Sequence, residues 1–336
     1  MADKSIFVIS DIHGCLQEFN ELLAKLPIKT NSQFVFLGDY IDRGPHSAGV
    51  IDRILKLKES YEVVALAGNH EQMLMHFLED KSTPEAASFV INGGGATLAS
   101  YSDSLGDYQM PEEHMDFLKS LKLCHEMDDD FFVHAGVPDV PLTKLHKKKY
   151  ESEMLWIRKP FFYSSYNWGK RIFHGHTPVK ECTIGEKRVN VDTGCVYGNK
   201  LTALMLPEME TFCVEKTEPL VNLCLIHEGS NRRAERFEVN LPVHIKSIHG
   251  ESVYKSVDYS ECGVFVRESQ QSREFLYSTG DVVSGTIGIN SMESVPFEGV
   301  VVRYQKKAVG AFFAIEFTMT PFELLYQNGE ESLPAE

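Results

Sequence analysis

The chain has 336 residues, of which 43% are hydrophobic and 24% charged, and its formal net charge is −15 at pH 7. This length exceeds what one ordinary core needs and predicts two domains. The acidic balance excludes broad binding to nucleic-acid polymers or anionic membranes, which needs a surplus of Lys and Arg. We find no signal-peptide core and no run of ~20 apolar residues for a spanning helix. The seven dispersed cysteines, without a CxxC pair, predict free thiols and a cytoplasmic protein.

The first half of the chain alternates apolar runs with amphipathic helical patterns. The predicted strand and helix pairs are 5–10 with 15–26, 33–39 with 47–60, and 61–68 with 71–80. This order predicts an α/β core with helices covering the sheet. Further strands are predicted in "DFFVHAG", "KRIFHGH", "RVNVDTG", "LTALMLP" and "TFCVEKT". The glycine-rich stretch 92–100, "NGGGATLAS", is typical of a flexible loop.

Beyond about residue 220 the helical periodicity disappears. Short alternating runs separated by turn signals follow: "RFEVNLPVHI", "GVFVRE", "DVVSGTIGI", "GVVVRY" and "AFFAIEF". Such runs predict a small β-barrel or sandwich. We therefore expect an α/β catalytic domain at 1–216, a linker at 217–227 and a small all-β barrel domain at 228–328.

Polar side chains follow five of the predicted strands. They are Asp11 and His13 in "SDIHG", Asp39, Asp42 and Arg43 in "GDYIDRG", Asn69 and His70 in "GNHE", His134 in "HAG", and His176 in "HGHT". Ligand sites of α/β sheets form at the carboxyl ends of strands. One Asp or His after a strand is an ordinary turn residue. Five strand ends with matching oxygen and imidazole donors, without thiolate, indicate a metal site instead.

This ordered motif set resembles the binuclear metallophosphoesterases of the phosphoprotein phosphatase family over roughly residues 5–210. "HAGVP", "EMLWIR", "GHTP" and "VDTGCVYGNKLTAL" resemble its bacterial branch, which includes protein phosphatases and dinucleoside tetraphosphate hydrolases. The resemblance implies an α/β metallophosphoesterase core of β-sheets flanked by helices. Two positions depart from the family: Ser10 replaces the usual Gly, and His174 replaces an apolar residue, so we expect His174 to be a packed or surface histidine.

The resemblance also implies two divalent metal ions, expected to be Mn²⁺, with Fe or Zn as alternatives. It assigns the ligands as Asp11 and His13 for one ion, Asp39 as a bridge to both, and Asn69, His134 and His176 for the other. Two such ions bind a shared water, lower its pKa and clamp the phosphoryl oxygens. Among the other residues, the resemblance makes His70 the general acid, with Asp42 orienting its imidazole and favouring the protonated form. Arg43 and Arg158 would grip the phosphate oxygens.

Three arginines, Arg232, Arg233 and Arg236, crowd into "RRAER". Surface pairing with a carboxylate such as Glu235 is their ordinary interpretation. However, "DYSECG" follows, and arginines at a domain entrance followed by D-x-S-x-x-G resemble the PilZ domain, the bacterial cyclic di-GMP receptor module, over about 228–325. The guanidinium group of Arg can form two parallel hydrogen bonds to phosphate oxygens or to O6 and N7 of guanine. In this motif the resemblance implies further ligand contacts from Asp258, Ser260 and Gly263.

Three functions stay open at this point. The first is a phosphatase acting on phosphoserine or phosphothreonine in proteins and regulated by cyclic di-GMP. The second is a dinucleoside tetraphosphate hydrolase, because the same metal core serves both and the surrounding cleft selects the substrate. The third is a cyclic di-GMP receptor whose phosphatase domain is mainly a scaffold, against which the intact ligand set argues. The expected partners are a phosphoprotein and cyclic di-GMP, and the oligomeric state stays open.

Overall fold

The structure is a computed structural model, and it comprises two compact units. It describes residues 4–102, 108–217, 238, 240–247, 250–260, 263–267, 277–288, 294–307 and 310–319. The first unit consists of Met1–Gln72 and Ala96–Val221, and the second of Met73–Gly95 and Asn222–Glu336. All of the expected linker except residue 217 lies outside the described residues, so its placement stays a prediction.

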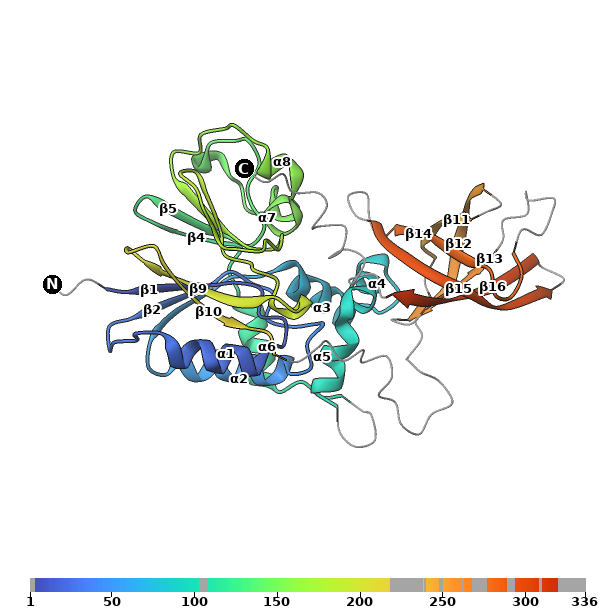
Figure 1. The fold of residues 1–336 in the computed structure, drawn as a ribbon, viewed down its shortest axis with the longest axis horizontal. Coiled ribbons are helices and arrows are strands. Elements are labelled where there is room, and N and C mark those ends of the chain that lie inside the picture. Colours follow the sequence, from blue (N-terminus) through green and yellow to red (C-terminus); the bar gives the residue numbers. More distant parts are fainter. Residues whose placement is uncertain are drawn as a thin grey trace. The chain divides into compact units, whose positions relative to one another are not determined.

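The first unit contains two five-stranded sheets (Figure 1). The first sheet has the order β10 (Glu210–Glu215), β9 (Lys200–Leu206), β1 (Ile6–Ile9), β2 (Gln33–Phe36) and β3 (Glu62–Ala65). The second has the order β4 (Cys124–Met127), β5 (Asp130–Val133), β6 (Arg171–His174), β8 (Arg188–Asn190) and β7 (Thr183–Ile184). Strands β1, β2 and β3 are parallel, as are β5, β6 and β8. The remaining strands, β9 and β10 in the first sheet and β4 and β7 in the second, pair antiparallel with their neighbours.

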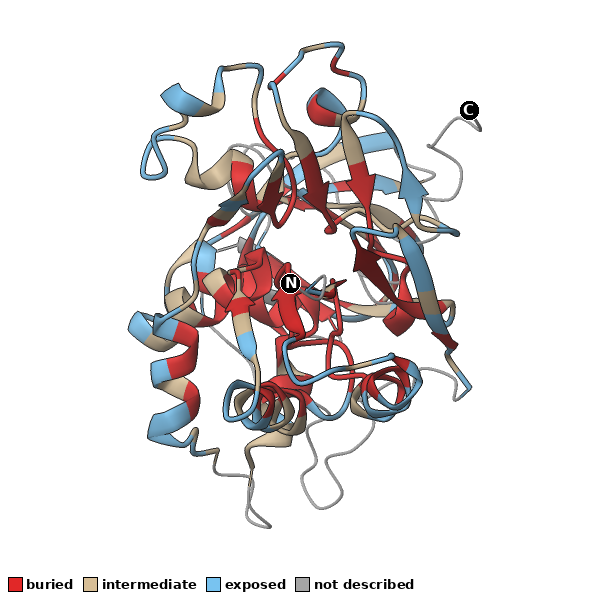
Figure 2. Ribbon diagram, turned by 90° about the vertical axis from the view of Figure 1, so that its left-hand side faces the viewer, coloured by how far each residue is buried: buried red, intermediate tan, exposed pale blue. Residues whose placement is uncertain are grey.

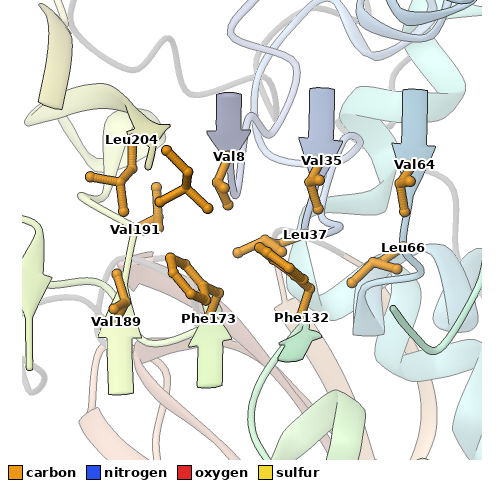
Figure 3. Packing of buried hydrophobic residues seen from close by; sticks show 11 residues of the cluster. Val8, Val35, Leu37, Val64, Leu66, Phe132, Phe173, Val189, Val191 and Leu204 are labelled. Atoms are coloured by element: carbon orange, nitrogen blue, oxygen red, sulfur yellow. The ribbon is translucent and has the colours of Figure 1, made fainter. Parts of the chain in front are cut away.

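The core of this unit lies between the two sheets. Val8 on β1 and Val35 on β2 point toward Phe132 on β5 and Phe173 on β6 (Figure 3). Both residues of each pair are fully buried, and β2 is buried along its whole length. Strands covered on both faces need near-continuous apolar runs, which explains the runs seen in the sequence. The strand ends that carry the polar motifs therefore come from two packed sheets.

Amphipathic helices cover the outer surface of the sheets. α1 buries Phe19, Leu22 and Leu23, whose spacing of three and four residues places them on one face. Figure 2 shows buried residues on the inner faces of the helices and exposed residues on the outer faces. The helices of this unit are α1 (Leu16–Lys25), α2 (Ser47–Lys58), the start of α3 (Asn69–Glu79), α5 (Gly95–Ser100), α6 (Glu112–Lys119), α7 (Glu151–Trp156) and α8 (Lys159–Phe162). The helices predicted at 15–26, 47–60 and 71–80 are thus present.

The expectation of a flexible loop at 92–100 is wrong. This stretch is a buried π-helical turn, Val90–Gly94, followed by α5. Gly93 has φ +95°, and a Cβ on Gly94 would come within 2.6 Å of the ring of Phe89. The glycines therefore serve a close-packed turn. Its continuation into α5 buries Thr97 completely.

The described part of the second unit contains α4 (Pro84–Phe89) and six antiparallel strands. The strands are β11 (Pro242–Ser247), β12 (Gly250–Ser260), β13 (Gly263–Arg267), β14 (Val282–Gly288), β15 (Ser294–Lys307) and β16 (Gly310–Met319). Each pairs with two others, and the pairing of β11 with β14 closes the sheet on itself. The alternating burial along β11 matches the sequence pattern. None of the helices described in either unit is long and apolar enough to span a membrane.

Candidate active site

Six candidate metal ligands converge from loops that follow strands of both sheets. Asp11 and His13 follow β1, Asp39 follows β2, Asn69 opens α3 after β3, His134 follows β5 and His176 follows β6. All six side chains are at least 95% buried. The structure therefore brings together every residue that the sequence motifs placed at this site.

Asp39 lies between two groups of donor atoms. One group is Asp39 with His13 and His70, the other is Asp39 with His134 and His176, and the donor atoms within each group lie within 4.8 Å of one another. Asp39 Oδ2 is 3.4 Å from His13 Nε2, whereas Oδ1 is 3.4 Å from His134 Nε2. The two carboxylate oxygens thus face different groups, which is the arrangement of a bridging carboxylate.

The second group fits a bound cation. His134 Nδ1 donates to the Leu37 carbonyl at 2.9 Å, which leaves the lone pair on Nε2. That lone pair faces Asn69 Oδ1 at 2.9 Å and His176 Nδ1 at 3.2 Å. A positive ion between these electron-rich atoms would satisfy them together.

The first group is arranged differently. His13 Nδ1 donates to the Ile41 carbonyl at 2.7 Å, so Nε2 carries the lone pair, and Arg43 Nη1 donates to it at 2.8 Å. Within the described part of the chain, neither group of three includes Asp11. Its carboxylate accepts the backbone N–H of His176 at 3.1 Å and the hydroxyl of Ser10. Ser10, where the family usually has Gly, thereby helps to hold Asp11.

The ionisation of these groups suits metal binding. Burial lowers the pKa of His13, His134 and His176, which keeps their imidazoles neutral and able to coordinate. Burial, followed by the negative charge of Asp11, raises the pKa of Asp39 well above its usual range. A pair of buried, mutually repelling carboxylates is stabilised by a cation beside them.

His70 and Asp42 form a buried pair, with His70 Nδ1 2.6 Å from Asp42 Oδ2. The expectation that Asp42 favours the protonated form of His70 stays a prediction. Burial and then the charge of Arg43 lower the pKa of His70 well below its usual value. The contribution of Asp42 is orientation, because it fixes the proton of the neutral ring on Nδ1 and leaves Nε2 for the site.

Two guanidinium groups lie beside the histidines. Arg43 is 9% exposed and packs over the ring of Tyr197, with 5.3 Å from its central carbon to the ring centroid. Arg158 is exposed and donates to the His176 carbonyl at 3.0 Å and to Thr177 Oγ1 at 3.3 Å. Arg43 thus contacts His13 of the first donor group, and Arg158 contacts the backbone of His176 of the second.

Glu71 is a residue of this site to which the sequence motifs assigned no role. Its carboxylate accepts three backbone N–H groups, from Gly68 at 2.9 Å, Asp39 at 3.0 Å and Tyr40 at 2.8 Å. It therefore ties the start of α3 to the loop that carries Asp39. The only sequence signal was its place as the last letter of "GNHE", which gives no hint of its partners.

The backbone at the site is unusual. Six of its residues have positive φ: Asp11 (48°), His13 (46°), Asp39 (56°), Asp42 (72°), Arg43 (69°) and His176 (67°). L-residues rarely adopt this left-handed region, and each instance costs roughly 1–2 kcal/mol. The loops hold these side chains in place against that local preference.

His174 is a packed histidine, as expected. It is 1% exposed, and its ring lies edge-on to Phe161 and Phe162 at centroid distances of 5.0 and 5.4 Å. Burial lowers the pKa of His174 to about 4. Its position between two phenylalanine rings explains why an apolar residue would serve equally well there.

The described part of the second unit contains three of the six residues expected to bind cyclic di-GMP. Asp258 and Ser260 lie at the end of β12, and Gly263 begins β13 directly opposite Ser260. A Cβ on Gly263 would come within 2.2 Å of the Ile315 carbonyl oxygen, so strand packing alone requires this glycine. The other three, Arg232, Arg233 and Arg236, lie outside the described residues.

Comparisons with known proteins identify the family. Residues 4–206 match the family model of calcineurin-like phosphoesterases. The asymmetrical bis(5'-nucleosyl)-tetraphosphatase PrpE of Anoxybacillus flavithermus is 32% identical over 246 residues, covering 64% of this chain and 95% of that protein. The protein of the same name from Oceanobacillus iheyensis is 31% identical over 241 residues, covering 64% and 94%.

Among solved structures, the cold-active protein-tyrosine phosphatase of a psychrophilic Shewanella species shares 20% identity at a TM-score of 0.45, over 65% of this chain and 80% of its own. That likeness is too weak to bear on the substrate. The family match and the relatives agree with the paired His and Asp groups, because phosphoesterases of this kind use divalent metal ions. The chain belongs to the calcineurin-like phosphoesterase family.

Proposed function

We propose that this metallophosphoesterase hydrolyses dinucleoside tetraphosphates. The observation that supports hydrolase activity is the pair of buried donor groups that share Asp39. The substrate is supported by relatives named bis(5'-nucleosyl)-tetraphosphatase, which this chain matches over 94–95% of their length. The expectation of phosphoserine or phosphothreonine substrates rested on the pairing with a signalling domain, and the relatives favour the alternative.

We assign the two metal ions to the ligands that converge in the structure. Asp11 and His13 would hold one ion, Asn69, His134 and His176 would hold the other, and Asp39 would be shared by both. When bound, such ions supply a water of lowered pKa and neutralise the phosphoryl oxygens. Asn69 and the histidines offer neutral donors, so the two aspartates set the charge of the site. Mn²⁺ is the expected metal, since oxygen and imidazole donors without thiolate suit it.

The remaining residues bind the substrate and move a proton. Arg43 and Arg158 grip the oxygens of the attacked phosphate through charge-assisted hydrogen bonds. His70 gives a proton from Nε2 to the leaving oxygen, because Asp42 occupies its Nδ1. The negative charge of the arriving polyphosphate raises the pKa of His70 and so favours the protonated ring at the moment it is needed.

The substrate is tested by turnover with Mn²⁺. We expect a higher kcat/KM for diadenosine tetraphosphate than for a phosphoserine peptide, and unequal products, a nucleoside triphosphate and a monophosphate, separated by chromatography. Asp39→Asn is the inactive control. A higher kcat/KM for the phosphopeptide would restore the protein phosphatase interpretation.

We also propose that the second unit binds cyclic di-GMP through Arg232, Arg233, Arg236, Asp258, Ser260 and Gly263. The support is the placement of the last three together where β12 meets β13, as a D-x-S-x-x-G ligand motif requires. A receptor with a scaffold phosphatase domain is disfavoured, because the complete set of donors converges on one buried site. Calorimetric titration with cyclic di-GMP tests this binding.

A further inference from the structure

Thr97 lies beside the proposed acid–base pair without touching His70. Its hydroxyl lies 2.6 Å from Asp42 Oδ1, the carboxylate oxygen that does not face His70. The backbone N–H of Asp42 also donates to Thr97 Oγ1, at 2.8 Å. Both side chains are fully buried. Thr97 therefore holds Asp42 by its main chain and its side chain at once.

The hydrogen bonds fix the direction of every proton. A backbone N–H can only donate, so the Asp42 N–H is shared between Thr97 Oγ1 at 2.8 Å and Ser47 Oγ at 3.1 Å, and the proton of Thr97 goes to Asp42 Oδ1. The contact of 3.0 Å to Ser47 Oγ is then donated by Ser47, which fills the second lone pair of Thr97. The hydroxyl of Thr97 is thus fully satisfied, with two of its three bonds made to Asp42.

The orientation of His70 follows from the same hydrogen bonds. With Asp42 Oδ1 occupied by Thr97, Asp42 Oδ2 receives the Nδ1–H of His70 at 2.6 Å. His70 Nε2 then points to the donor groups, 3.9 Å from Asp39 Oδ2. Asp42 has φ 72°, a conformation that needs support from outside its own backbone. Loss of the Thr97 hydroxyl would remove one of the hydrogen bonds that hold the carboxylate in this orientation, and that carboxylate orients the ring of His70.

We propose that Thr97 is a positioning residue of the reaction: its hydroxyl clamps Asp42 so that His70 keeps its proton on Nδ1 and presents Nε2 to the leaving oxygen. This proposal rests on the acid role proposed for His70. The glycine-rich stretch 92–100 would then have a role in the site, because its tight turn directly precedes α5, on which Thr97 lies beside Asp42. A threonine with a purely structural role would also need hydrogen-bond partners, but two of its three hydrogen bonds would not need to be made to the residue that orients His70.

The kinetic test uses Thr97→Val, which keeps the shape and removes the hydroxyl, and Thr97→Ser, which restores it. With phenyl phosphate as the substrate, whose leaving oxygen needs a proton, we expect Thr97→Val to lower kcat by roughly 10- to 100-fold, as loss of a hydrogen bond to a charged group does. KM and metal content should stay unchanged, and Thr97→Ser should recover most of the rate. In a His70→Asn background, Thr97→Val should cause no further loss. A further loss there would assign Thr97 a purely structural role and overturn the proposal.

A matched control variant and a second measurement distinguish failure of the Thr97 proposal from failure of the proposed substrate. Ser100 lies on the same helix; its hydroxyl accepts from Ala48 N at 3.2 Å and donates to the Thr97 carbonyl at 2.8 Å. It makes no hydrogen bond to Asp42 among the described residues, so Ser100→Ala should leave kcat unchanged. In the metal-free protein, proton NMR should show a slowly exchanging Nδ1–H resonance that His70→Asn lacks. Thr97→Val should shift or broaden it, and Thr97→Ser should keep it. An unmoved resonance in Thr97→Val would refute the clamp, even if the proposed substrate proved wrong.

Discussion

His134 Nε2 lies 3.2 Å from His176 Nδ1, and Asn69 Oδ1 lies 2.9–3.0 Å from both. Neutral imidazoles bring lone pairs this close when a cation lies between them. We therefore expect Mn²⁺ to raise the unfolding temperature of the chelated protein. At a free metal concentration 100 times Kd, the stabilisation is about 2.7 kcal/mol for one site. Calorimetry with and without Mn²⁺ measures it.

The control for this prediction is another buried histidine. His114, 4% exposed, bonds Tyr101 and Asp52 and takes no part in the donor groups. His114→Gln should keep the Mn²⁺-induced shift, whereas His176→Ala should lose most of it. Equal shifts in the two variants would contradict the assignment of His176.

Glu71→Gln should weaken both folding and metal binding. The amide would turn its NH₂ toward at least one of the three backbone N–H groups that the carboxylate now accepts. We expect a loss of about 2 kcal/mol in the free energy of unfolding. Metal affinity should fall as well, because the loop that carries Asp39 loses an anchor. Denaturant unfolding and metal titration measure the two effects, with the exposed Glu79→Gln at the far end of α3 as the unaffected control.

His70→Asn should lower kcat more for substrates whose leaving oxygen is more basic and therefore needs a proton to depart. General acid catalysis contributes roughly 10²–10⁴-fold where the leaving oxygen needs a proton. The loss should be large on phenyl phosphate and smaller on diadenosine tetraphosphate, whose leaving group is already a stable nucleotide phosphate. Metal content should not change. An equal loss on both substrates would argue against proton donation by His70.

His174→Phe should make the protein more resistant to acid. The pKa of His174 is about 4 in the folded chain and about 6.5 when unfolded, so between these values the unfolded state binds more protons. Wild-type stability should therefore fall relative to the variant as pH decreases from about 6.5 to 4, by at most about 1.4 kcal/mol per pH unit. Denaturant unfolding across this range measures the gap. Parallel pH curves would show that the buried imidazole does not titrate as expected.

Arg236→Ala should abolish cyclic di-GMP binding, because it removes a fork onto phosphate or guanine. Asp258→Asn should weaken it more mildly, since it keeps the shape and loses an anionic acceptor for a guanine N–H. Titration calorimetry compares both with wild type. Gly263→Ala is not a useful probe, because the added methyl group would meet the Ile315 carbonyl whether or not a nucleotide binds. Unchanged affinity in Arg236→Ala would refute the assignment of that arginine.

The residues of the site that could be predicted from the sequence were the Asp, Asn and His side chains that directly follow successive predicted strands. Asp39 and His134 could be placed because strand periodicity predicts where a strand ends. Glu71 and Thr97 could not, because their partners are backbone amides and a carboxylate brought near only by folding. The glycines before Thr97 gave a loop signal, whereas close packing against Phe89 made them part of a helical turn. The lowered pKa of His70 depends on depth of burial, which sequence neighbours do not reveal.

The left-handed backbone at Asp11, His13, Asp39 and His176 sets stability and activity against each other. Glycine adopts this conformation without penalty, so glycine at any one of these positions relaxes the local backbone while deleting a donor atom. A laboratory selection for heat resistance in metal-free buffer would therefore enrich glycine wherever this relief exceeds the loss of the side chain's packing and hydrogen bonds. The selected variants would be more stable but catalytically inactive. The same selection with Mn²⁺ present would disfavour them, because they would lose the stabilisation that bound metal provides.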